Sequence, residues 1–192
     1  MVLAHEMTHR MRNVLGLVQG ISHQTVLTSS TLSEYQRAFE TRLLALARAQ
    51  ELIVDNSDIP TDLTALLDRA LEPFGKDRFV MSGLATTVPR ELASSLALLV
   101  HELGTNALKY GALCVPEGTI AISWASEQNR TRLVWKEMNG PPVAAPLREG
   151  FGTRLMKTAF PITWGSASID FEPDGVQCQI LFPRASGSAN RT

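Results

Sequence analysis

Two apolar stripes at helical spacing dominate the first 55 residues of this chain and constrain its fold more than any other feature. Apolar residues recur every three or four positions, first at Leu3, Met7, Met11, Val14, Val18 and Ile21, then at Leu32, Tyr35, Phe39, Leu43, Leu46 and Ile53. A polar run at residues 28–31 separates the two stripes. This spacing is typical of one face of an α-helix. Since a hairpin cannot bury both stripes alone, the sequence predicts half of a four-helix bundle, completed by a second subunit in a homodimer. The alternative is a monomer whose hairpin packs on the chain's own second domain.

The pattern changes after residues 55–60, which read Asp-Asn-Ser-Asp-Ile-Pro and predict a turn. Helices are expected at 61–73, 90–110 and 153–160, and strands at 78–81, 85–88, 119–125, 131–137, 167–171 and 176–182. The core face of the central helix is expected to carry Leu92, Leu96, Leu99, Leu103 and Ala107. The sequence therefore predicts an α+β fold, with a helical hairpin at 1–56, a domain at 57–185 whose helices cover a mixed, mostly antiparallel sheet, and a tail at 186–192.

Composition excludes several classes of protein. Hydrophobic residues make up 44% and charged residues 19% of the 192 residues, as in a packed globular core. The formal net charge is -1, so no basic excess indicates nucleic-acid binding, and no apolar run is long enough to span a membrane. Cys114 and Cys178 have no CxxC spacing, which favours a reducing, cytoplasmic compartment.

Residues 5–9 read His-Glu-Met-Thr-His, an H-E-x-x-H match that on a helix would place two imidazoles at the spacing of zinc ligands. A zinc protease also needs a third ligand and a substrate-binding sheet, which normally precedes this helix. Only four residues precede His5, and no His or Glu cluster with ligand spacing follows. We therefore interpret the match as coincidental.

The central helix carries a second polar pattern. Glu102 and Asn106 are spaced i and i+4, so both project from the same side of the helix, next to its apolar face. A carboxylate and an amide oxygen at this distance suit Mg²⁺ on a nucleotide, because Mg²⁺ prefers a few oxygen ligands together with water and phosphate. Lys109 adds a cation near the end of the helix. The alternative for an arbitrary helix is a solvated charged face.

The segment at 101–113, His-Glu-Leu-Gly-Thr-Asn-Ala-Leu-Lys-Tyr-Gly-Ala-Leu, resembles the N box of the GHKL ATPases, and more narrowly that of HWE histidine kinases. That family is named for a His in the N box and a Trp-x-Glu in the next box, here His101 and Trp135-Lys136-Glu137. The resemblance implies a Bergerat-type α/β sandwich that binds ATP and Mg²⁺. It places Glu137 where these ATPases bind the adenine amino group, whereas Trp135 serves packing equally well.

Residues 150–152, Gly-Phe-Gly, look like the family's glycine box, which opens an expected helix where backbone amides can face polyphosphate. The resemblance implies nucleotide contacts from these boxes, at Glu102, Asn106, Lys109, Tyr110, Glu137, Gly140, Gly150, Gly152 and Thr153, with Glu102 and Asn106 on the metal. One departure is Asn139, where the family usually has Gly. Because Asn tolerates positive φ better than other non-glycine residues, the turn is expected to survive.

The same resemblance extends to the first helix, where Glu6, His9, Arg10, Arg12 and Asn13 match the family's phosphoacceptor box. It implies that His9 is the phosphorylated nucleophile. Glu6, one turn earlier, would orient the imidazole or take its proton, and Arg10 or Asn13 would steady the phosphoryl group. The helical phase places His9 opposite the apolar stripe, so its side chain is expected to face solvent.

These resemblances predict a sensor histidine kinase core that autophosphorylates on His9 and transfers the phosphoryl group to an aspartate of a response-regulator receiver domain. Two alternatives stay open. The chain could be a phosphotransfer adaptor whose ATPase-like domain only binds partners, or a GHKL ATPase without a His acceptor. Family members usually carry a sensory domain before the hairpin, so the chain is expected to be a fragment.

Overall fold

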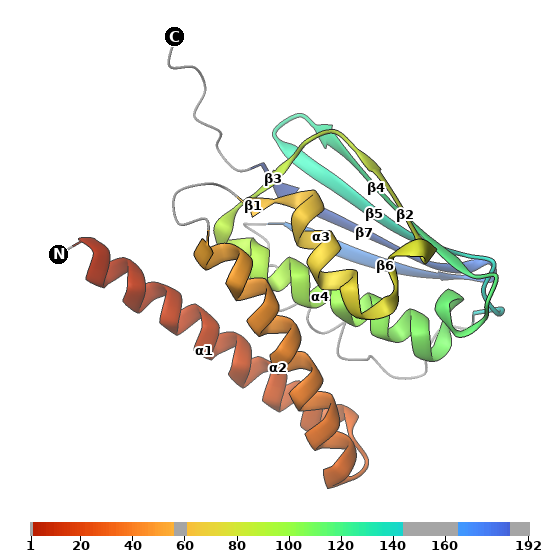
Figure 1. Ribbon diagram of the computed structural model, residues 1–192, viewed down its shortest axis with the longest axis horizontal. Helices are drawn as coiled ribbons and strands as arrows, with labels where there is room; N and C mark the ends of the chain where they lie inside the picture. The colour runs from red at the N-terminus through yellow and green to blue at the C-terminus, as the bar shows by residue number, and fades with distance from the viewer. Residues whose placement is uncertain (1, 56–60, 144–164, 185–192) are drawn as a thin grey trace.

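The computed structural model describes residues 2–55, 61–143 and 165–184, with side chains from Met11 onward except at 13 and 52–55. Its first part is a hairpin of α1 (Val2–Thr28) and α2 (Leu32–Asp55). Figure 1 shows the two helices meeting at their connecting turn and diverging toward the N-terminus. The helices end and begin at the polar run predicted from the sequence.

Local hydrogen bonds fix this turn. The backbone N–H of Glu34 donates to the Thr31 hydroxyl at 3.1 Å, so Thr31 caps the start of α2. The Glu34 carboxylate in turn accepts the backbone N–H of Ser30 at 2.8 Å. One N–H group that a helix start leaves without a partner is thereby satisfied, and the second bond holds the residue before the cap.

The apolar stripes are only partly covered. Ile21 and Leu46 are buried, and the Tyr35 ring stacks on Phe39 with centroids 5.5 Å apart. Met11 and Leu32, however, are 61% and 72% exposed. The stripes are therefore covered where the hairpin packs on the rest of the chain, and the exposure of Met11 and Leu32 agrees with the expectation that the hairpin cannot bury both stripes alone.

The remaining elements are β1 (Thr61–Asp62), α3 (Leu63–Leu71), β2 (Phe79–Gly83), β3 (Thr87–Val88), α4 (Arg90–Tyr110), β4 (Thr119–Glu127), β5 (Arg130–Met138), β6 (Ser166–Glu172) and β7 (Gly175–Pro183), with 3-10 turns η1 (Glu72–Phe74), η2 (Lys76–Arg78) and η3 (Ala112–Cys114). The described strands form a five-stranded sheet in the order β2-β4-β5-β7-β6, and a small β1-β3 pair. Only β2 and β4 pair in parallel within the described larger sheet. The predicted mixed, mostly antiparallel sheet is confirmed.

The helix expected at 61–73 begins later and ends earlier than predicted. Thr61 pairs with Val88 in the small sheet, and Asp62 caps α3 by accepting the backbone N–H of Ala65 at 2.8 Å. The strand expected at 85–88 is reduced to β3. The helix expected at 153–160 lies outside the described residues.

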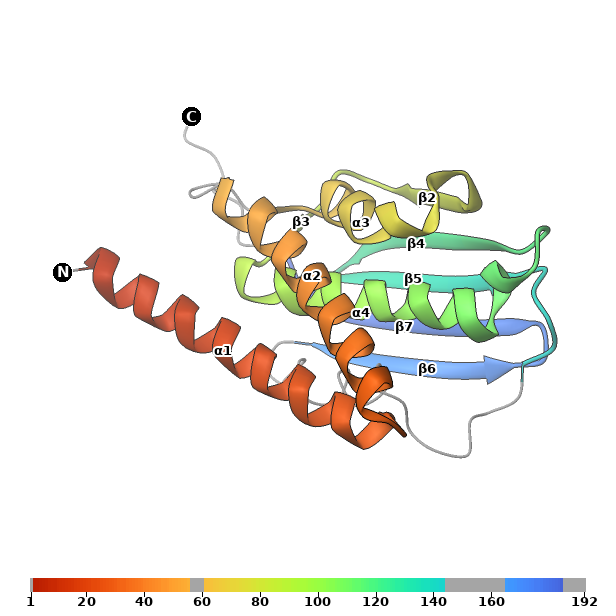
Figure 2. The same cartoon turned by 60° about the horizontal axis from the view of Figure 1, so that its bottom comes forward.

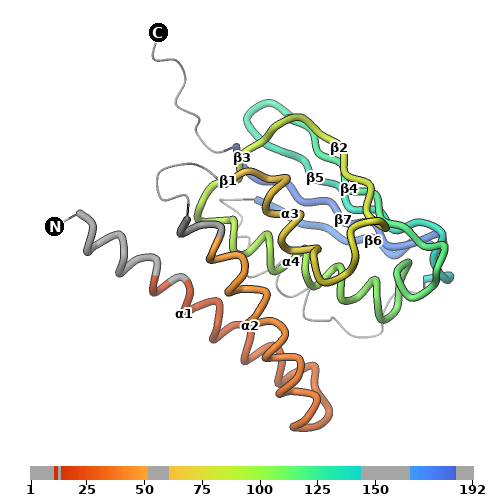
Figure 3. The backbone as a smooth tube through the Cα atoms, viewed as in Figure 1, coloured from red at the N-terminus to blue at the C-terminus, as the bar shows by residue number. Residues whose placement is uncertain are grey.

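Helices α3 and α4 cover one face of the larger sheet, and α2 crosses over them (Figures 1 and 2). Alternate residues of β4 and β5 point into this layer, so Ile120, Ile122, Leu133 and Trp135 are buried. Helix α4 has the bounds predicted from its periodicity, and the five core positions predicted for it are all buried. Figure 3 traces the backbone from β2 through β3 into this helix.

Arg78 anchors the segment that follows α4. Its guanidinium donates to the backbone carbonyls of Leu113 and Ala112 at 3.2 Å, and to those of Val115 and Gly118. One cation thus satisfies carbonyl groups along the whole turn between α4 and β4. Because the end of α4 carries the N box, this clamp also fixes the position of the predicted nucleotide residues.

Replacing Arg78 by Met is expected to lower the free energy of unfolding by about 3 kcal/mol, because carbonyl groups lose a charged donor. Urea denaturation measures this change. Arg132→Met is the matched control: Arg132 pairs with Glu127 at 2.9 Å on the surface, and its loss should cost about 0.5 kcal/mol. Equal losses in the two variants would contradict the role given to Arg78.

Candidate active site

The C-terminal half of α4 presents the predicted N-box residues in two different environments. Asn106, Lys109 and Tyr110 are exposed, whereas Glu102 is buried one turn earlier. Glu102 faces α2, where the Arg42 guanidinium contacts both of its carboxylate oxygens, at 2.9 and 3.0 Å. The oxygen chemistry of Glu102 and Asn106 fits Mg²⁺. Of the two, Asn106 is accessible and Glu102 is held by Arg42.

His101, the family's N-box histidine, is buried beside these residues. Its ring lies 5.1 Å from that of Phe74, and its Nε2 finds no hydrogen-bond partner within the described part of the chain. Burial lowers the pKa of His101, and the positive charges of Arg48 and Arg42 act in the same direction. Glu102 and the Ala70 backbone oppose this shift. His101 is therefore a neutral packing residue at neutral pH.

Glu137 lies at the end of β5, buried under the segment that follows α4. Its carboxylate accepts the backbone N–H of Ala112 at 2.8 Å. Burial raises the pKa of Glu137, and the Ala112 N–H opposes the shift by favouring the ionised form. The nearby Trp135 indole N–H also favours the ionised form of Glu137. Within the described residues, however, Trp135 Nε1 donates no hydrogen bond of normal geometry.

Trp135 and Glu137 alternate in phase along β5, as the sequence predicted, and both are buried on the helical side of the sheet. The Trp135 ring meets the Phe79 ring edge to face with centroids 6.1 Å apart. This contact supports the packing interpretation of Trp135. The tryptophan and the carboxylate therefore occupy one wall beneath α4.

The turn after β5 depends on two unusual backbone positions. Asn139 has a φ of +56°, so the turn expected to survive with Asn in place of Gly is present. At Gly140 a Cβ atom would lie 2.7 Å from the Ala112 Cα, which no side chain could tolerate without a shift. At Gly111 a Cβ would lie 2.0 Å from a Glu137 carboxylate oxygen, so a side chain there would displace the carboxylate that accepts the Ala112 N–H. Glycine at these positions lets the two segments touch.

The other predicted residues are described only in part. Helix α1 includes the backbone of the phosphoacceptor box, but the side chains of Glu6, His9, Arg10 and Asn13 lie outside the described residues. The predicted exposure of His9 is therefore still a prediction. Gly150, Gly152 and Thr153 lie outside the described residues as well.

Arg42 is the site residue that sequence analysis missed. It stands on α2 sixty positions before Glu102, and its spacing matched no box. A weak indication was available, because Arg42 is a charge adjoining the apolar stripe at Leu43 and Leu46. A cation beside a helix face that must be buried requires an anionic partner, but the sequence did not say which.

Comparison with known proteins identifies the class. A family model described as HWE histidine kinase matches residues 6–85. A blue-light-activated histidine kinase of Brucella anthropi is 32% identical to this chain, over 95% of the chain and 39% of the relative. A namesake from Brucella abortus is 30% identical with the same coverage. The chain thus spans 39% of the length of these relatives.

Solved structures agree in fold. A blue-light-activated histidine kinase of Erythrobacter litoralis matches with a TM-score of 0.67 and 17% identity, covering 93% of this chain and 60% of that one. Its histidine kinase domain alone matches with a TM-score of 0.64 and 17% identity, over 89% and 84%. The helical hairpin and the one-sided helical layer over a mixed sheet are thus a fold that this chain shares with these histidine kinase structures. The chain belongs to the HWE histidine kinase family.

Across the described residues, the helices lack an apolar stretch of the length that crossing a membrane requires.

The buried Glu137 makes stability depend on pH. Because its pKa is raised in the folded state, the native protein is favoured while Glu137 is protonated, and this stabilisation is lost as pH rises above about 4.5 through the raised pKa. Glu137→Gln removes the titration but keeps an oxygen for the Ala112 N–H. We expect the stability of Glu137→Gln relative to wild type to increase between pH 4.5 and 7.5, measured by urea unfolding.

The exposed carboxylate Glu117 provides the control. Glu117→Gln should show a much smaller change relative to wild type across the same pH range. A difference between Glu137→Gln and wild type that stays constant with pH would contradict the effect of burial on the pKa of Glu137.

Proposed function

We propose that this chain is the catalytic core of a two-component histidine kinase, which uses ATP to phosphorylate its own His9 and passes the phosphoryl group to an aspartate of a response regulator. The observation that carries the proposal is that one fold contains both the phosphoacceptor box and the N box. Helix α1 contains the phosphoacceptor box, and α4, against which the hairpin packs, contains the N box.

The chemistry needs a nucleophile, a proton acceptor and groups that hold the phosphates. A His9 nitrogen forms a bond to the γ-phosphorus while the bond from that phosphorus to the bridging oxygen breaks, and ADP leaves. Glu6, one turn before His9, orients the imidazole or accepts its proton. Arg10 or Asn13 stabilises the charge on the phosphoryl group as it transfers.

The nucleotide would lie at the exposed end of α4. Asn106 supplies an amide oxygen for Mg²⁺ together with Glu102, and Lys109 and Tyr110 stand exposed within the next turn. Glu137 and Gly140 border the adenine side, and Gly150, Gly152 and Thr153 offer backbone groups to the phosphates. A Mg²⁺ ion held there would supply positive charge that offsets the negative charge of the phosphates.

A homodimer through the hairpin is part of the proposal. Large apolar side chains are exposed on both of its helices, namely Met11, Leu15, Val26, Leu27, Leu32 and Leu44. Burying such residues against a second copy would complete a four-helix bundle.

We place the core in the cytoplasm, where ATP and receiver domains are found, with no role in nucleic-acid binding.

Incubation with γ-labelled ATP tests the acceptor. We expect wild type to incorporate acid-labile label and His9→Ala to incorporate none, because the attacking nitrogen is gone. His5→Ala is the matched control, since it removes the other histidine of the H-E-x-x-H match and should label normally. Label retained in His9→Ala would contradict the assignment of His9 as the phosphorylated residue.

Calorimetry with ATP and Mg²⁺ separates the kinase from the phosphotransfer adaptor. A kinase core binds the nucleotide and labels itself. An adaptor would bind none and would accept a phosphoryl group only from another kinase. Nucleotide turnover without a labelled histidine would instead favour an ATPase.

A further inference from the structure

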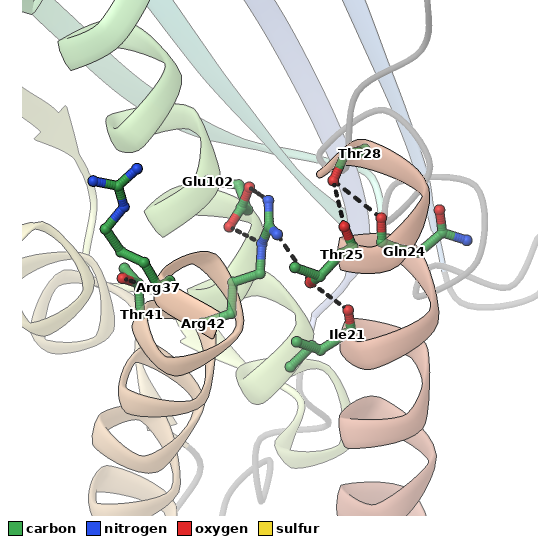
Figure 4. Close-up of polar contacts among 8 residues, drawn as sticks. All are labelled: Ile21, Gln24, Thr25, Thr28, Arg37, Thr41, Arg42 and Glu102. Carbon is green, nitrogen blue, oxygen red and sulfur yellow. Dashed lines mark hydrogen bonds and ion pairs between the residues drawn. The ribbon is translucent and has the colours of Figure 1, made fainter. Parts of the chain in front are cut away.

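The N-box carboxylate is held by the helical hairpin. Arg42 Nε donates to Glu102 Oε1 at 2.9 Å, and Arg42 Nη2 donates to Glu102 Oε2 at 3.0 Å (Figure 4). The side chains are only 12% and 4% exposed. This is a two-point, largely desolvated ion pair between α2 and α4, the geometry in which arginine and a carboxylate interact most strongly.

A third contact ties the same guanidinium to α1. Arg42 Nη1 donates to the Thr25 hydroxyl at 2.9 Å, and that hydroxyl donates onward to the Ile21 carbonyl at 2.5 Å. Thr25 is fully buried. Because arginine can only donate, the hydroxyl must accept here, and its own proton is then committed to Ile21. Arg42 therefore joins α1, α2 and α4 in one network, which Figure 4 shows.

The packing of α2 on α4 places Arg42 opposite Glu102. A second polar contact, from Gln50 Nε2 to Ser94 Oγ at 2.5 Å, lies eight residues further along α2 and eight residues back along α4. The two helices thus run antiparallel in one register over about 12 Å. Alanine side chains lie between these contacts at Ala45, Ala49 and Ala97 and leave room for close approach. The ion pair belongs to a built interface.

The pairing conflicts with the use of Glu102 by a nucleotide. A carboxylate binds Mg²⁺ through its oxygens and negative charge, and here a guanidinium contacts both oxygens and neutralises the charge. A divalent cation at the same oxygens would lie close to the Arg42 charge in a desolvated space, where repulsion between like charges is strong. Glu102 can serve the hairpin or the metal nucleotide, and each weakens the other.

We propose that the Arg42–Glu102 pair is a latch, which holds the hairpin on α4 in a state that binds nucleotide weakly and opens when the nucleotide and Mg²⁺ bind. The latch rests on the proposed function, in which Glu102 serves the metal nucleotide. Coupling between two binding events is reciprocal, so nucleotide must loosen the hairpin by the same factor by which the docked hairpin weakens nucleotide. A signal that moves the hairpin would then set nucleotide affinity.

Calorimetry with a non-hydrolysable ATP analogue and Mg²⁺ measures the first half of this coupling. Arg42→Gln is expected to raise the affinity at least fivefold, because Glu102 loses its competing cation. Thr25→Val keeps the side-chain volume and leaves both Arg42–Glu102 contacts in place, while it removes the third contact together with the hydroxyl's bond to Ile21. It should shift affinity in the same direction by a smaller factor. Arg37→Gln is the matched control, since Arg37 is exposed on the same helix and points away from Glu102 (Figure 4). It should bind like wild type.

Thiol labelling measures the second half. Cysteine is introduced at Ala45, inside the α2–α4 interface, with the exposed Cys114 changed to Ser. Cys178 does not interfere, because it is buried and its pKa is raised to about 12, chiefly by burial and then by the Asp170 carboxylate. The analogue with Mg²⁺ should speed labelling at position 45 severalfold, and Arg42→Gln should speed it without nucleotide.

The outcomes are distinct. Equal analogue affinity in wild type and Arg42→Gln would overturn the latch and leave the proposed function intact, since the pair would then be purely structural. The latch is also overturned if the analogue binds and labelling at position 45 does not change. Binding by no variant would overturn the proposed function and the coupling with it. If Arg42→Gln does not fold, as circular dichroism would show, Thr25→Val decides the matter alone.

Discussion

Helix α4 is buried on most of its sides, and the arrangement of the other elements follows from that burial. Fourteen of its 21 residues are buried, which requires packing partners around nearly the whole helix. The sheet covers one side, and α3 and α2 cover the others (Figure 2). A helix enclosed in this way cannot tilt without opening apolar surface on several sides. The position of its exposed end, which carries Asn106 and Lys109, is therefore fixed by the buried part of the helix.

Such enclosure also restricts which polar residues the helix can carry. Buried polar groups need partners, and on α4 two of them find these partners on α2, Ser94 with Gln50 and Glu102 with Arg42. Where no side chain fits, glycine stands: a Cβ at Gly104 would lie 2.6 Å from the Phe74 ring. The hairpin is thus specified by the polar residues of α4 as much as by its own apolar stripe.

The sequence predicted what depends on local pattern and failed where distant contacts decide. The bounds of α4 and the phase of Trp135 and Glu137 follow from periodicity, and the turn at Asn139 follows from the conformational preference of one residue type. The later start of α3 could not be predicted, because it depends on Thr61 pairing with Val88. Periodicity likewise cannot tell which part of a stripe is covered, and it gave no partner for Arg42.

The Arg42–Glu102 pair is difficult to explain by stability alone. Removing two charges from water is costly, and a well-packed apolar pair of similar volume usually stabilises an interface as well or better. An α2–α4 interface already lined with Ala45, Ala49 and Ala97 would accept such a pair. What an apolar pair cannot do is respond to a cation. A carboxylate whose charge is neutralised by the hairpin in one state and is available to Mg²⁺ in the other ties hairpin position to nucleotide occupancy, and this requires an ion pair at that position.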